Sequence, residues 1–395
     1  MTGGLDIAQL RADTSGCAGL THFNQAGAGL PPRAVTEAMT RRIAHEAQEG
    51  PMESAPSAEG MKARARDLAA GLLGCSPAEV ALLGSGAAAW GVPVAALPAL
   101  RPGDRILVSQ QEWGGNLATL QVMAARSGAV IEPMPVLEDG RTDLAALAAR
   151  IDDRVRLICL TWLPCNSGLI DDAEGIGRIA STAGVPYVID AAQAVGQIPI
   201  DVDRIGCDVL AATARKHLRG PRGTALLYIR GSFLPQLSPG WFDLGSAPWD
   251  NGTPRPRTDA RVFETNEVSA VLVAGLEAAL DLTTRLGVDA IRARVAVLAD
   301  MLRDRLAQMP GVTLLDRGGV QSGLVTFALD GIPAPALRAR LAEERIAIGV
   351  NGTAYTPIDM TARGLDEVAR AAVSYLTTEA EIDTLCAALA RCARA

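Results

Sequence analysis

The sequence contains one amine that stands apart from its basic neighbours. Only two of the 37 basic residues are lysines, Lys62 and Lys216. Arginine keeps its proton near neutral pH, whereas lysine becomes a nucleophile once burial and nearby cations lower its pKa. Lys216 follows the apolar run 207–212, and the cations next to it in the sequence are Arg215, His217, Arg219 and Arg222. This setting favours a lysine that forms a Schiff base, with a surface loop lysine as the alternative.

A carboxylate closes the preceding apolar strand. Asp190 ends the run 186–189 and lies 26 residues before Lys216, which is about one strand–helix–strand unit. A carboxylate at the end of a buried strand costs free energy unless it meets a cation. Asp190 is therefore a candidate partner for a positively charged group.

Two further stretches suit a flat, anionic ligand. After the expected strand 79–83, the run from Gly84 to Ala89 places small residues at a helix start, where free N–H groups bind phosphate. After the expected strand 105–109, Trp113 stands beside two glycines and offers a ring for stacking, with a core tryptophan as an equal alternative. The small residues around Ala26 and Gly27 let the backbone approach a ligand or form a plain turn.

Alternating strands and helices predict how these residues are positioned. Strands are expected at 79–83, 105–109, 130–134, 156–161, 186–190, 207–212 and 225–229, and helices at 34–48, 58–73 and 173–183. This order predicts a doubly wound, mainly parallel sheet with the ligand at the carboxyl ends of its strands. Residues 231–260 are expected to be irregular, and 268–309 helical with a break near Gly287. A smaller C-terminal α/β domain follows, with strands at 312–315, 323–327, 347–350 and 372–375 and a helix at 378–393. The predicted divisions are an N-terminal segment 1–20, a large domain 21–255 and a small domain 256–395.

Composition narrows the possible functions. The formal charge of −7 argues against nucleic acid or an anionic membrane as the main partner. The N-terminus lacks the pattern of a signal peptide, and seven cysteines without a CxxC pair favour a reducing compartment, so we expect a cytoplasmic protein. Three histidines and the lack of an HExxH motif argue against a metal site. A nicotinamide-dependent dehydrogenase is disfavoured because the run after Gly84 lacks the last glycine of the dinucleotide fingerprint.

Together these motifs resemble a known family. The run Asp190-Ala191-Ala192-Gln193, followed by Lys216 and the Gly-Pro-Arg-Gly turn at 220–223, resembles the class V aminotransferase family. The resemblance extends from the loop at 24–27 to the helix start at 378–383, and it is greatest to the branch of isopenicillin N epimerase-like proteins and the ergothioneine-pathway C–S lyase. It implies a fold-type I enzyme that uses pyridoxal 5'-phosphate (PLP), acts on an amino acid and forms a homodimer.

The resemblance also implies roles for individual residues. Lys216 would attach PLP as a Schiff base, and Asp190 would pair with the ring nitrogen. The other residues on the cofactor side would be Gly86 and Ala87 at the phosphate, Trp113 over the ring, Gln193 at the phenolic oxygen, and Thr213 and Arg215 in the family's phosphate-binding positions. Arg370 would grip the substrate α-carboxylate through a bidentate pair.

Several positions depart from the family pattern. The substrate-side asparagine of the family falls on Cys165, with Asn166 next to it, and Ala26 and Gly27 complete the expected substrate side. Ala87 replaces a phosphate-binding threonine. The threonine that relatives supply across the dimer falls between Thr265 and Glu267, and by count on Glu267, whose carboxylate would not bind phosphate. That role stays open.

The resemblance favours β-elimination from a cysteine derivative, which is a C–S lyase reaction. Residues 349–370 contain no cysteine, which argues against the persulfide relay of cysteine desulfurases. An epimerase or aminotransferase of the same family and a non-catalytic protein with this fold are the alternatives. The candidates for the side-chain pocket are Tyr355, Trp241, Trp249 and Arg222.

Overall fold

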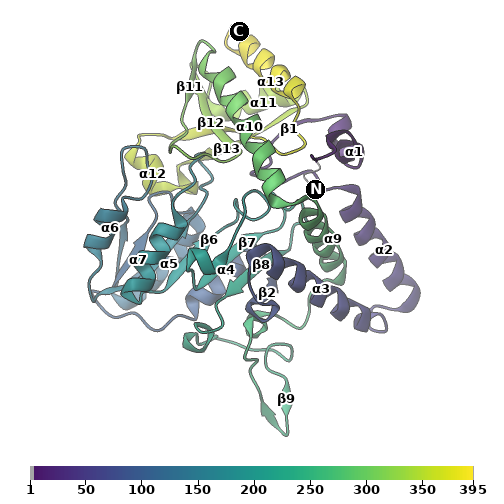
Figure 1. Cartoon of the computed structure of the whole chain (residues 1–395), viewed down its shortest axis with the longest axis vertical. Helices are drawn as coiled ribbons and strands as arrows, with labels where there is room; N and C mark the ends of the chain where they lie inside the picture. Colours follow the sequence, from purple (N-terminus) through teal and green to yellow (C-terminus); the bar gives the residue numbers. More distant parts are fainter. Residues whose placement is uncertain (1–3, 395) are drawn as a thin grey trace.

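In the computed structural model, which describes residues 4–394, apolar strands form a seven-stranded sheet in the larger part of the molecule (Figure 1). Its strands, in spatial order, are β2 (Val80–Leu83), β8 (Ala225–Ile229), β7 (Val209–Thr213), β6 (Tyr187–Asp190), β5 (Val155–Thr161), β3 (Arg105–Val108) and β4 (Val130–Pro133). The strands from β7 to β4 are parallel, and β8 runs antiparallel to both β7 and β2. The predicted mainly parallel sheet is confirmed.

Helices cover both faces of this sheet because its central strands are apolar on both sides. Alternate residues of β5, such as Ile158 and Leu157, belong to two different core clusters, one on each face. One cluster includes residues of α3 (Ala55–Leu73), α6 (Leu144–Arg150), α7 (Ala173–Ala183), α8 (Val202–Ile205) and α9 (Ala270–Leu286). The other includes residues of α4 (Gly86–Ala95), α5 (Gly114–Ser127) and the short 3-10 helix η4 (Ala260–Phe263).

A second sheet of five strands forms the smaller part. Its order is β1 (Thr21–Phe23), β13 (Ile346–Gly352), β14 (Glu367–Ala372), β12 (Leu324–Leu329) and β11 (Val312–Leu314). Its core includes apolar residues of α10 (Val288–Ala307), α11 (Ala334–Glu343) and α13 (Glu379–Cys392). The short helix α1 (Ile7–Ala12) packs against this core through Leu10, whereas Ile358 of α12 (Pro357–Ala362) packs against a core cluster of the larger part.

Two elements cross the predicted boundary between domains. β1 pairs in parallel with β13, so residues 21–23 belong to the smaller sheet. α9 packs against α2 (Arg33–Glu49) and α3, so residues after 256 also contribute to the larger part. The division at 255 stays a prediction. The chain starts in the smaller sheet with β1, continues into the larger part, and returns to the smaller part after α9.

The structure corrects one strand and refines the irregular segment. The smaller sheet uses β14 at 367–372 rather than 372–375, which places Arg370 within a strand. Residues 231–260 include a two-stranded hairpin of β9 (Trp249–Asp250) and β10 (Thr253–Pro254), which projects as an arm at the bottom of Figure 1. The predicted helix break is confirmed, because Gly287 separates α9 from α10 with φ of 77°.

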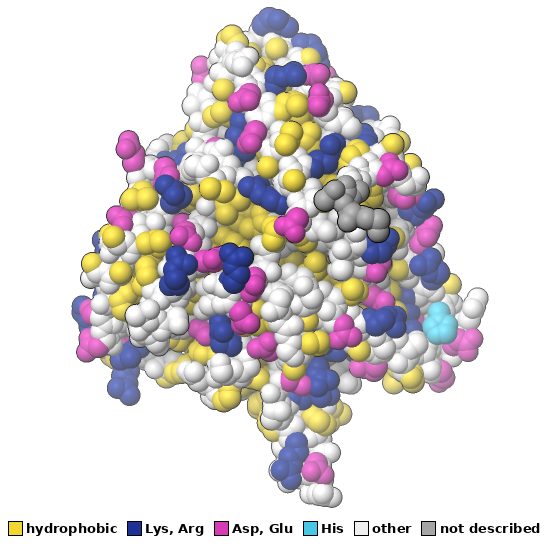
Figure 2. All heavy atoms as spheres, viewed as in Figure 1, with side chains coloured by type: hydrophobic (Ala, Val, Ile, Leu, Met, Phe, Trp, Pro, Cys, Tyr) yellow, Lys and Arg dark blue, Asp and Glu magenta, His cyan; other side chains and the backbone are white. Residues whose placement is uncertain are grey.

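The surface carries charges of both signs. On the face in Figure 2, acidic and basic side chains are interspersed. Within residues 4–394, no helix is both long enough and apolar enough to cross a bilayer.

One close approach of two helices gives a test of this packing. A Cβ built on Gly177 in α7 would lie 1.8 Å from the backbone carbonyl oxygen of Ile205 in α8. Because backbone cannot swing aside, we expect Gly177→Ala to lower the free energy of unfolding by about 2 kcal/mol. Thermal unfolding followed by circular dichroism measures the change.

Gly71→Ala in α3 is the matched control, because a Cβ there meets nothing within 4 Å. It should raise the free energy of unfolding by about 0.5–1 kcal/mol. Equal behaviour of the two variants would contradict the close packing of α7 on α8.

Candidate active site

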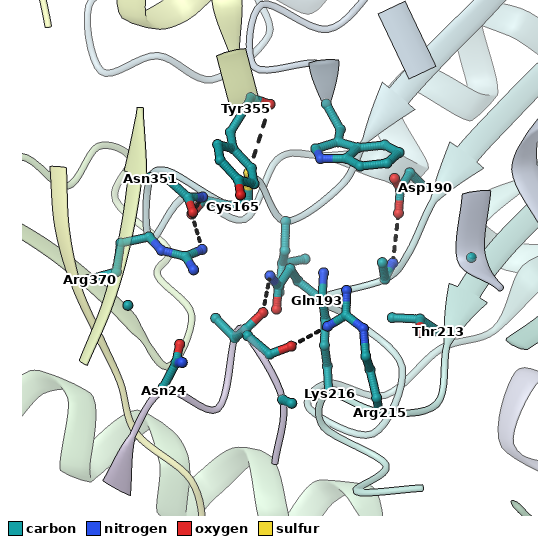
Figure 3. A pocket seen from close by; sticks show the side chains of 18 of the residues that line it. Asn24, Cys165, Asp190, Gln193, Thr213, Arg215, Lys216, Asn351, Tyr355 and Arg370 are labelled. Carbon is teal, nitrogen blue, oxygen red and sulfur yellow. Dashed lines mark hydrogen bonds between the residues drawn. The ribbon is translucent and has the colours of Figure 1, made fainter. Parts of the chain in front are cut away.

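A cavity of about 550 Å³ opens where the carboxyl ends of β5, β6 and β7 meet the smaller sheet. Figure 3 shows Asp190 on one side, Arg370 on the opposite side and Lys216 between them. The lining residues that the sequence predicted are Ala26, Gly27, Gly86, Ala87, Trp113, Cys165, Asp190, Gln193, Thr213, Arg215, Lys216, Arg222, Tyr355 and Arg370. The carboxyl ends of neighbouring strands thus gather residues that are far apart in the chain.

Lys216 lies just beyond β7 and extends into the cavity, next to Arg215 (Figure 3). The loop after β1 supports it from below. Gln25 donates to the Lys216 carbonyl through Nε2 at 2.9 Å, and the backbone N–H of Gly29 donates to the Arg215 carbonyl at 2.9 Å. A Cβ on Gly29 would come within 2.7 Å of the Lys216 carbonyl oxygen, so this close support requires glycine.

Burial lowers the pKa of the Lys216 amine to about 8. The charge of Asp190 opposes this shift by raising the pKa, and the guanidinium groups of Arg215 and Arg370 assist it by lowering the pKa. With this pKa, about a tenth of the amine is neutral at pH 7, far more than for an ordinary lysine, and the neutral amine is the form that acts as nucleophile or base.

Two residues that the sequence suggested as cations lowering the Lys216 pKa, Arg219 and His217, do not have that role in the structure. Arg219 turns away from the cavity and donates to the Tyr375 hydroxyl at 2.5 Å and the Thr14 hydroxyl at 2.7 Å. Burial lowers the pKa of His217 to about 3, so its ring is neutral. The Lys216 pKa therefore depends on burial first, then on Asp190 and on the arginines that face the same cavity.

Asp190 is held in place by two hydrogen bonds. Its Oδ2 accepts from Asn116 Nδ2 at 3.0 Å, and its Oδ1 accepts from the backbone N–H of Ala192 at 2.9 Å. Asn116 lies in the first turns of α5, which follows β3. The carboxylate is thereby fixed at the end of β6, where it faces the cavity.

A second carboxylate, which sequence reasoning missed, lies behind Asp190. Glu112 is fully buried, and its Oε1 accepts from Asn116 Nδ2 and from the Thr161 hydroxyl, each at 2.9 Å. Its Oε2 accepts from the Ser109 hydroxyl at 2.8 Å and from the Thr161 N–H at 3.2 Å. Burial raises the pKa of Glu112 to about 7, and the charge of Asp190 contributes to the rise. Asn116 thus links two carboxylates, only one of which lines the cavity.

Trp113 lines the cavity as the sequence allowed. Its backbone N–H donates to the Thr161 hydroxyl at 3.0 Å. A Cβ on Gly115 would lie 2.2 Å from Trp113 Cζ3, so the glycine leaves room for the indole ring. The start of α5, where Trp113 is the N-cap, therefore positions the indole ring.

The Gln193 amide is oriented by its neighbours. Its Nε2 donates to the Ala26 carbonyl at 3.0 Å, and its Oε1 lies 3.1 Å from His217 Nε2. The same ring nitrogen lies 3.1 Å from Gln197 Nε2. His217 therefore acts within a buried amide network rather than as a cation.

The residues predicted for an anion converge at one end of the cavity. The N-terminus of α4 presents Gly86 and Ala87, with Ser85 as its N-cap. Thr213 ends β7 beside Gly86, since a Cβ on Gly86 would lie 3.3 Å from Thr213 Cβ. Arg215 is half-buried and donates through Nη1 to the Gly27 carbonyl. Free N–H groups, a hydroxyl and a guanidinium at one spot suit a phosphate.

Arg370 has bonding capacity left for an anion. It is buried in β14, and its Nη1 donates to the Cys165 carbonyl at 2.8 Å. Its Nε is buried without a hydrogen-bond partner in the described part of the chain. An unpaired buried guanidinium N–H is costly, so a carboxylate that accepts from this edge would be bound firmly.

The structure separates Cys165 from Asn166. Cys165 lines the cavity, whereas Asn166 is fully buried and points away from it. The Asn166 amide donates to the Thr356 hydroxyl at 3.0 Å, and its oxygen accepts from Asn351 Nδ2 at 2.6 Å. The predicted substrate contact through Asn166 is therefore replaced by a structural role, because these bonds turn the amide inward.

Other candidates are placed as follows. Tyr355 and Arg222 line the cavity, but Trp241 and Trp249 are 52% and 63% exposed in the segment that carries the arm and do not line it. Thr265 donates to the Glu267 carbonyl at 3.2 Å on the exposed surface. The lining residues that the sequence did not indicate include Asn24, Thr161, Arg338 and Asn351. Within residues 4–394, no cluster of three His, Cys, Asp or Glu residues could hold a metal ion.

The chain is similar to known proteins over most of its length. The profile of the Aminotransferase class-V family matches residues 21–385. A probable cysteine desulfurase of Xylella fastidiosa is 32% identical over 296 residues, which is 74% of this chain and 70% of the relative. A cysteine desulfurase of Dickeya dadantii is 31% identical over 74% of this chain and 71% of its own.

Solved structures are similar along nearly the whole chain. A mutant of C-DES with glycine covalently linked to the PLP cofactor has a TM-score of 0.88 and 27% identity, covering 96% of this chain and 98% of that chain. C-DES, described as a cystine C–S lyase, in complex with its product cysteine persulfide, has a TM-score of 0.87 and 27% identity, covering 95% and 99%. The cysteine desulfurase of Thermococcus onnurineus shares the fold, with a TM-score of 0.91 at 21% identity over all of both chains.

The carboxylate behind Asp190 gives a pH test. Because the folded protein raises the Glu112 pKa from 4.5 to about 7, the folded state holds the proton more tightly than the unfolded state. The contribution of Glu112 to stability is therefore greatest below pH 4.5 and falls as pH rises through 7. Relative to Glu112→Gln, we expect the wild-type free energy of unfolding to fall by up to about 3 kcal/mol between pH 5 and 8.

Thermal unfolding of both proteins across this pH range measures the difference. Glu138→Gln, an exposed acid on the surface, is the control and should give a difference that does not vary with pH in this way. A wild-type advantage over Glu112→Gln that is constant with pH would contradict the buried, proton-holding state of Glu112.

Proposed function

The chain belongs to the class V aminotransferase family of PLP-dependent enzymes, and we propose that it breaks the Cβ–S bond of an L-cysteine derivative by β-elimination. The observation that carries this proposal is the position of Lys216. Its buried amine lies in one cavity with a fixed carboxylate, Asp190, and a guanidinium with unused donors, Arg370.

The residues of the cavity fit PLP. Lys216 would hold its carbonyl carbon, and Asp190 would face the ring nitrogen. The cradle of Gly86, Ala87, Thr213 and Arg215 suits the phosphate. Trp113 and Gln193 would contact the ring and its phenolic oxygen. The buried, unpartnered Nε of Arg370 then remains for a substrate carboxylate.

When bound, PLP withdraws electron density from the substrate α-carbon. The protein supplies the proton transfer and the orientation. Arg370 grips the α-carboxylate and thereby fixes the Cα–H bond relative to the Lys216 amine. With a pKa near 8, this amine can accept the α-proton at neutral pH. Asp190 would stabilise positive charge on the ring nitrogen of the bound cofactor.

Elimination then sends the sulfur away with the bonding electrons. Overall, R–S–CH2–CH(NH3+)–COO− and one water give R–SH, pyruvate and ammonium, so that no oxidant or reductant is needed. The chain offers no cysteine between 349 and 370 to receive the sulfur. Cys165 lines the cavity, but burial raises the pKa of its thiol, which leaves it protonated and a poor sulfur acceptor. Release of the sulfur as a free thiol follows.

The names of the relatives support sulfur chemistry. The matched curated relatives are cysteine desulfurases, and C-DES is described as a cystine C–S lyase. Both descriptions imply cleavage of the bond between sulfur and the β-carbon of a cysteine unit, and we propose the same cleavage for this chain. Epimerisation, transamination and a non-catalytic role are the alternatives that the test below separates.

Two further proposals concern the setting of the enzyme. We retain the homodimer that the resemblance implies, with the role of Thr265 and Glu267 at a partner's cofactor open. We also retain a cytoplasmic location, which seven free cysteines support because thiols persist in reducing compartments.

The reaction is tested with S-methyl-L-cysteine and L-cystine. The PLP-loaded enzyme should release pyruvate and methanethiol in equal amounts from S-methyl-L-cysteine, and pyruvate and cysteine persulfide in equal amounts from L-cystine. A lactate dehydrogenase assay measures pyruvate, and a thiol reagent and a persulfide assay measure the sulfur products. Lys216→Ala should lower the rate by about 10³-fold, because it removes the base. Lys62→Ala, at the only other lysine, should leave the rate unchanged.

Other products would overturn the proposal. Exchange of the α-proton for deuterium without pyruvate would indicate an epimerase. A keto acid that retains its sulfur would indicate an aminotransferase. Cofactor binding without any exchange or turnover of an L-amino acid would indicate a non-catalytic protein.

A further inference from the structure

The cavity carries more positive charge than the proposed cofactor and an amino acid backbone require. Four arginines line it, Arg215, Arg222, Arg338 and Arg370, and Asp190 is the acidic residue among the lining residues. Across residues 4–394, none of these arginines lies within ion-pair distance of a carboxylate. Elsewhere, two buried arginines pair with carboxylates, Arg66 with Glu264 at 2.6 Å and Arg303 with Asp316 at 2.8 Å. Arg222 and Arg338 are exposed at the cavity and have no such partner in the described part of the chain.

Two of these arginines already have tasks. Arg215 belongs to the phosphate cradle, and Arg370 faces the α-carboxylate position. The charge of Asp190 would be offset by the protonated ring nitrogen of the cofactor. A phosphate carries a charge of about −2, and an α-carboxylate adds one more negative charge. Arg222 and Arg338 therefore bring more positive charge than these anions neutralise.

Arg222 is held at the cavity by a tight turn. It follows Lys216 in the Gly-Pro-Arg-Gly turn, which the Thr224 hydroxyl stabilises by donating to the Pro221 carbonyl at 2.8 Å. Gly223 adopts φ of 86°, which favours glycine, and a Cβ there would lie 2.9 Å from Leu272. The charge of Arg222, like that of Arg370, lowers the pKa of Arg215, after the larger effect of burial. These cations therefore lie close enough to repel one another.

Arg338 reaches the same cavity from the smaller part of the molecule. It lies in α11, whose neighbouring Leu337 and Leu341 are fully buried and fix the helix against the core. Arg338 itself is exposed and lines the cavity. Arg222 and Arg338 thus come from different parts of the fold and share one cavity, where like charges repel unless an anion lies between them.

We propose that the substrate is an L-cysteine S-conjugate whose sulfur substituent carries a carboxylate, which Arg222 and Arg338 bind. This inference rests on the proposed function for the reaction but on the unpaired arginines for the substrate class. The second carboxylate completes the charge balance of the cavity. It leaves with the thiol when the Cβ–S bond breaks, so the product is a mercapto acid.

The test compares two nearly isosteric compounds, S-carboxymethyl-L-cysteine and its amide, S-carbamoylmethyl-L-cysteine. The PLP-loaded enzyme should favour the carboxylate by at least about tenfold in kcat/KM, which corresponds to one charge-assisted hydrogen bond. In R222Q/R338Q the ratio should fall toward one, mainly through the carboxylate compound. R340Q, on the same helix but outside the cavity lining, is the control and should keep the wild-type ratio.

Equilibrium binding separates this inference from the reaction. Isothermal titration calorimetry with PLP-loaded Lys216→Ala protein gives the dissociation constants of both compounds, and it should show the same tenfold preference. Preferential binding by the Lys216→Ala protein, together with no pyruvate release by the wild-type enzyme, would sink the lyase proposal and keep the substrate class. Equal binding of the two compounds, or a preference unchanged in R222Q/R338Q, would overturn the inference.

Discussion

The desolvation of one lysine is the constraint on which this site depends. Lys216 stands in a cavity where burial favours the uncharged amine. Asp190, the acidic residue of the cavity lining, opposes that effect because its charge raises the Lys216 pKa. A carboxylate placed closer to the amine would return it to the charged form. Arginines supply the other permanent charges of the cavity, and they cannot act as nucleophiles. The site therefore contains one reactive amine among permanently charged cations.

The rest of the fold maintains this distribution of charge. The parallel sheet brings Asp190 and Lys216 to one edge, and the smaller sheet brings Arg370 from β14 to the opposite side. The loop after β1 supports the Lys216 backbone from below. Behind Asp190, the Asn116 amide connects it to the buried Glu112. Two distant parts of the chain must therefore pack together before the amine, the carboxylate and the guanidinium face each other.

The sequence predicted the residues that end apolar strands better than those that share side-chain networks. Asp190 and Lys216 could be found because a polar group after a buried strand is conspicuous, and Arg370 could be found only through the family resemblance. The inward turn of Asn166 depends on partners more than 180 residues away, which periodicity does not reveal. The same holds for Arg219, which is adjacent to the site in sequence but bonds to Tyr375. Glu112 was missed because its burial depends on the packing of distant elements, such as the strand that carries its partner Thr161, and its nearby partners Ser109 and Asn116 do not reveal that burial.

The most direct test of the central claim is to locate the amine that holds the cofactor. The PLP-loaded protein would be reduced with borohydride, digested and analysed by mass spectrometry. The structure predicts a phosphopyridoxyl group on the peptide that contains Lys216, because this amine lines the same cavity as Asp190 and has a lowered pKa. A label on Lys62 or on the N-terminal amine, or no label at all, would contradict the account.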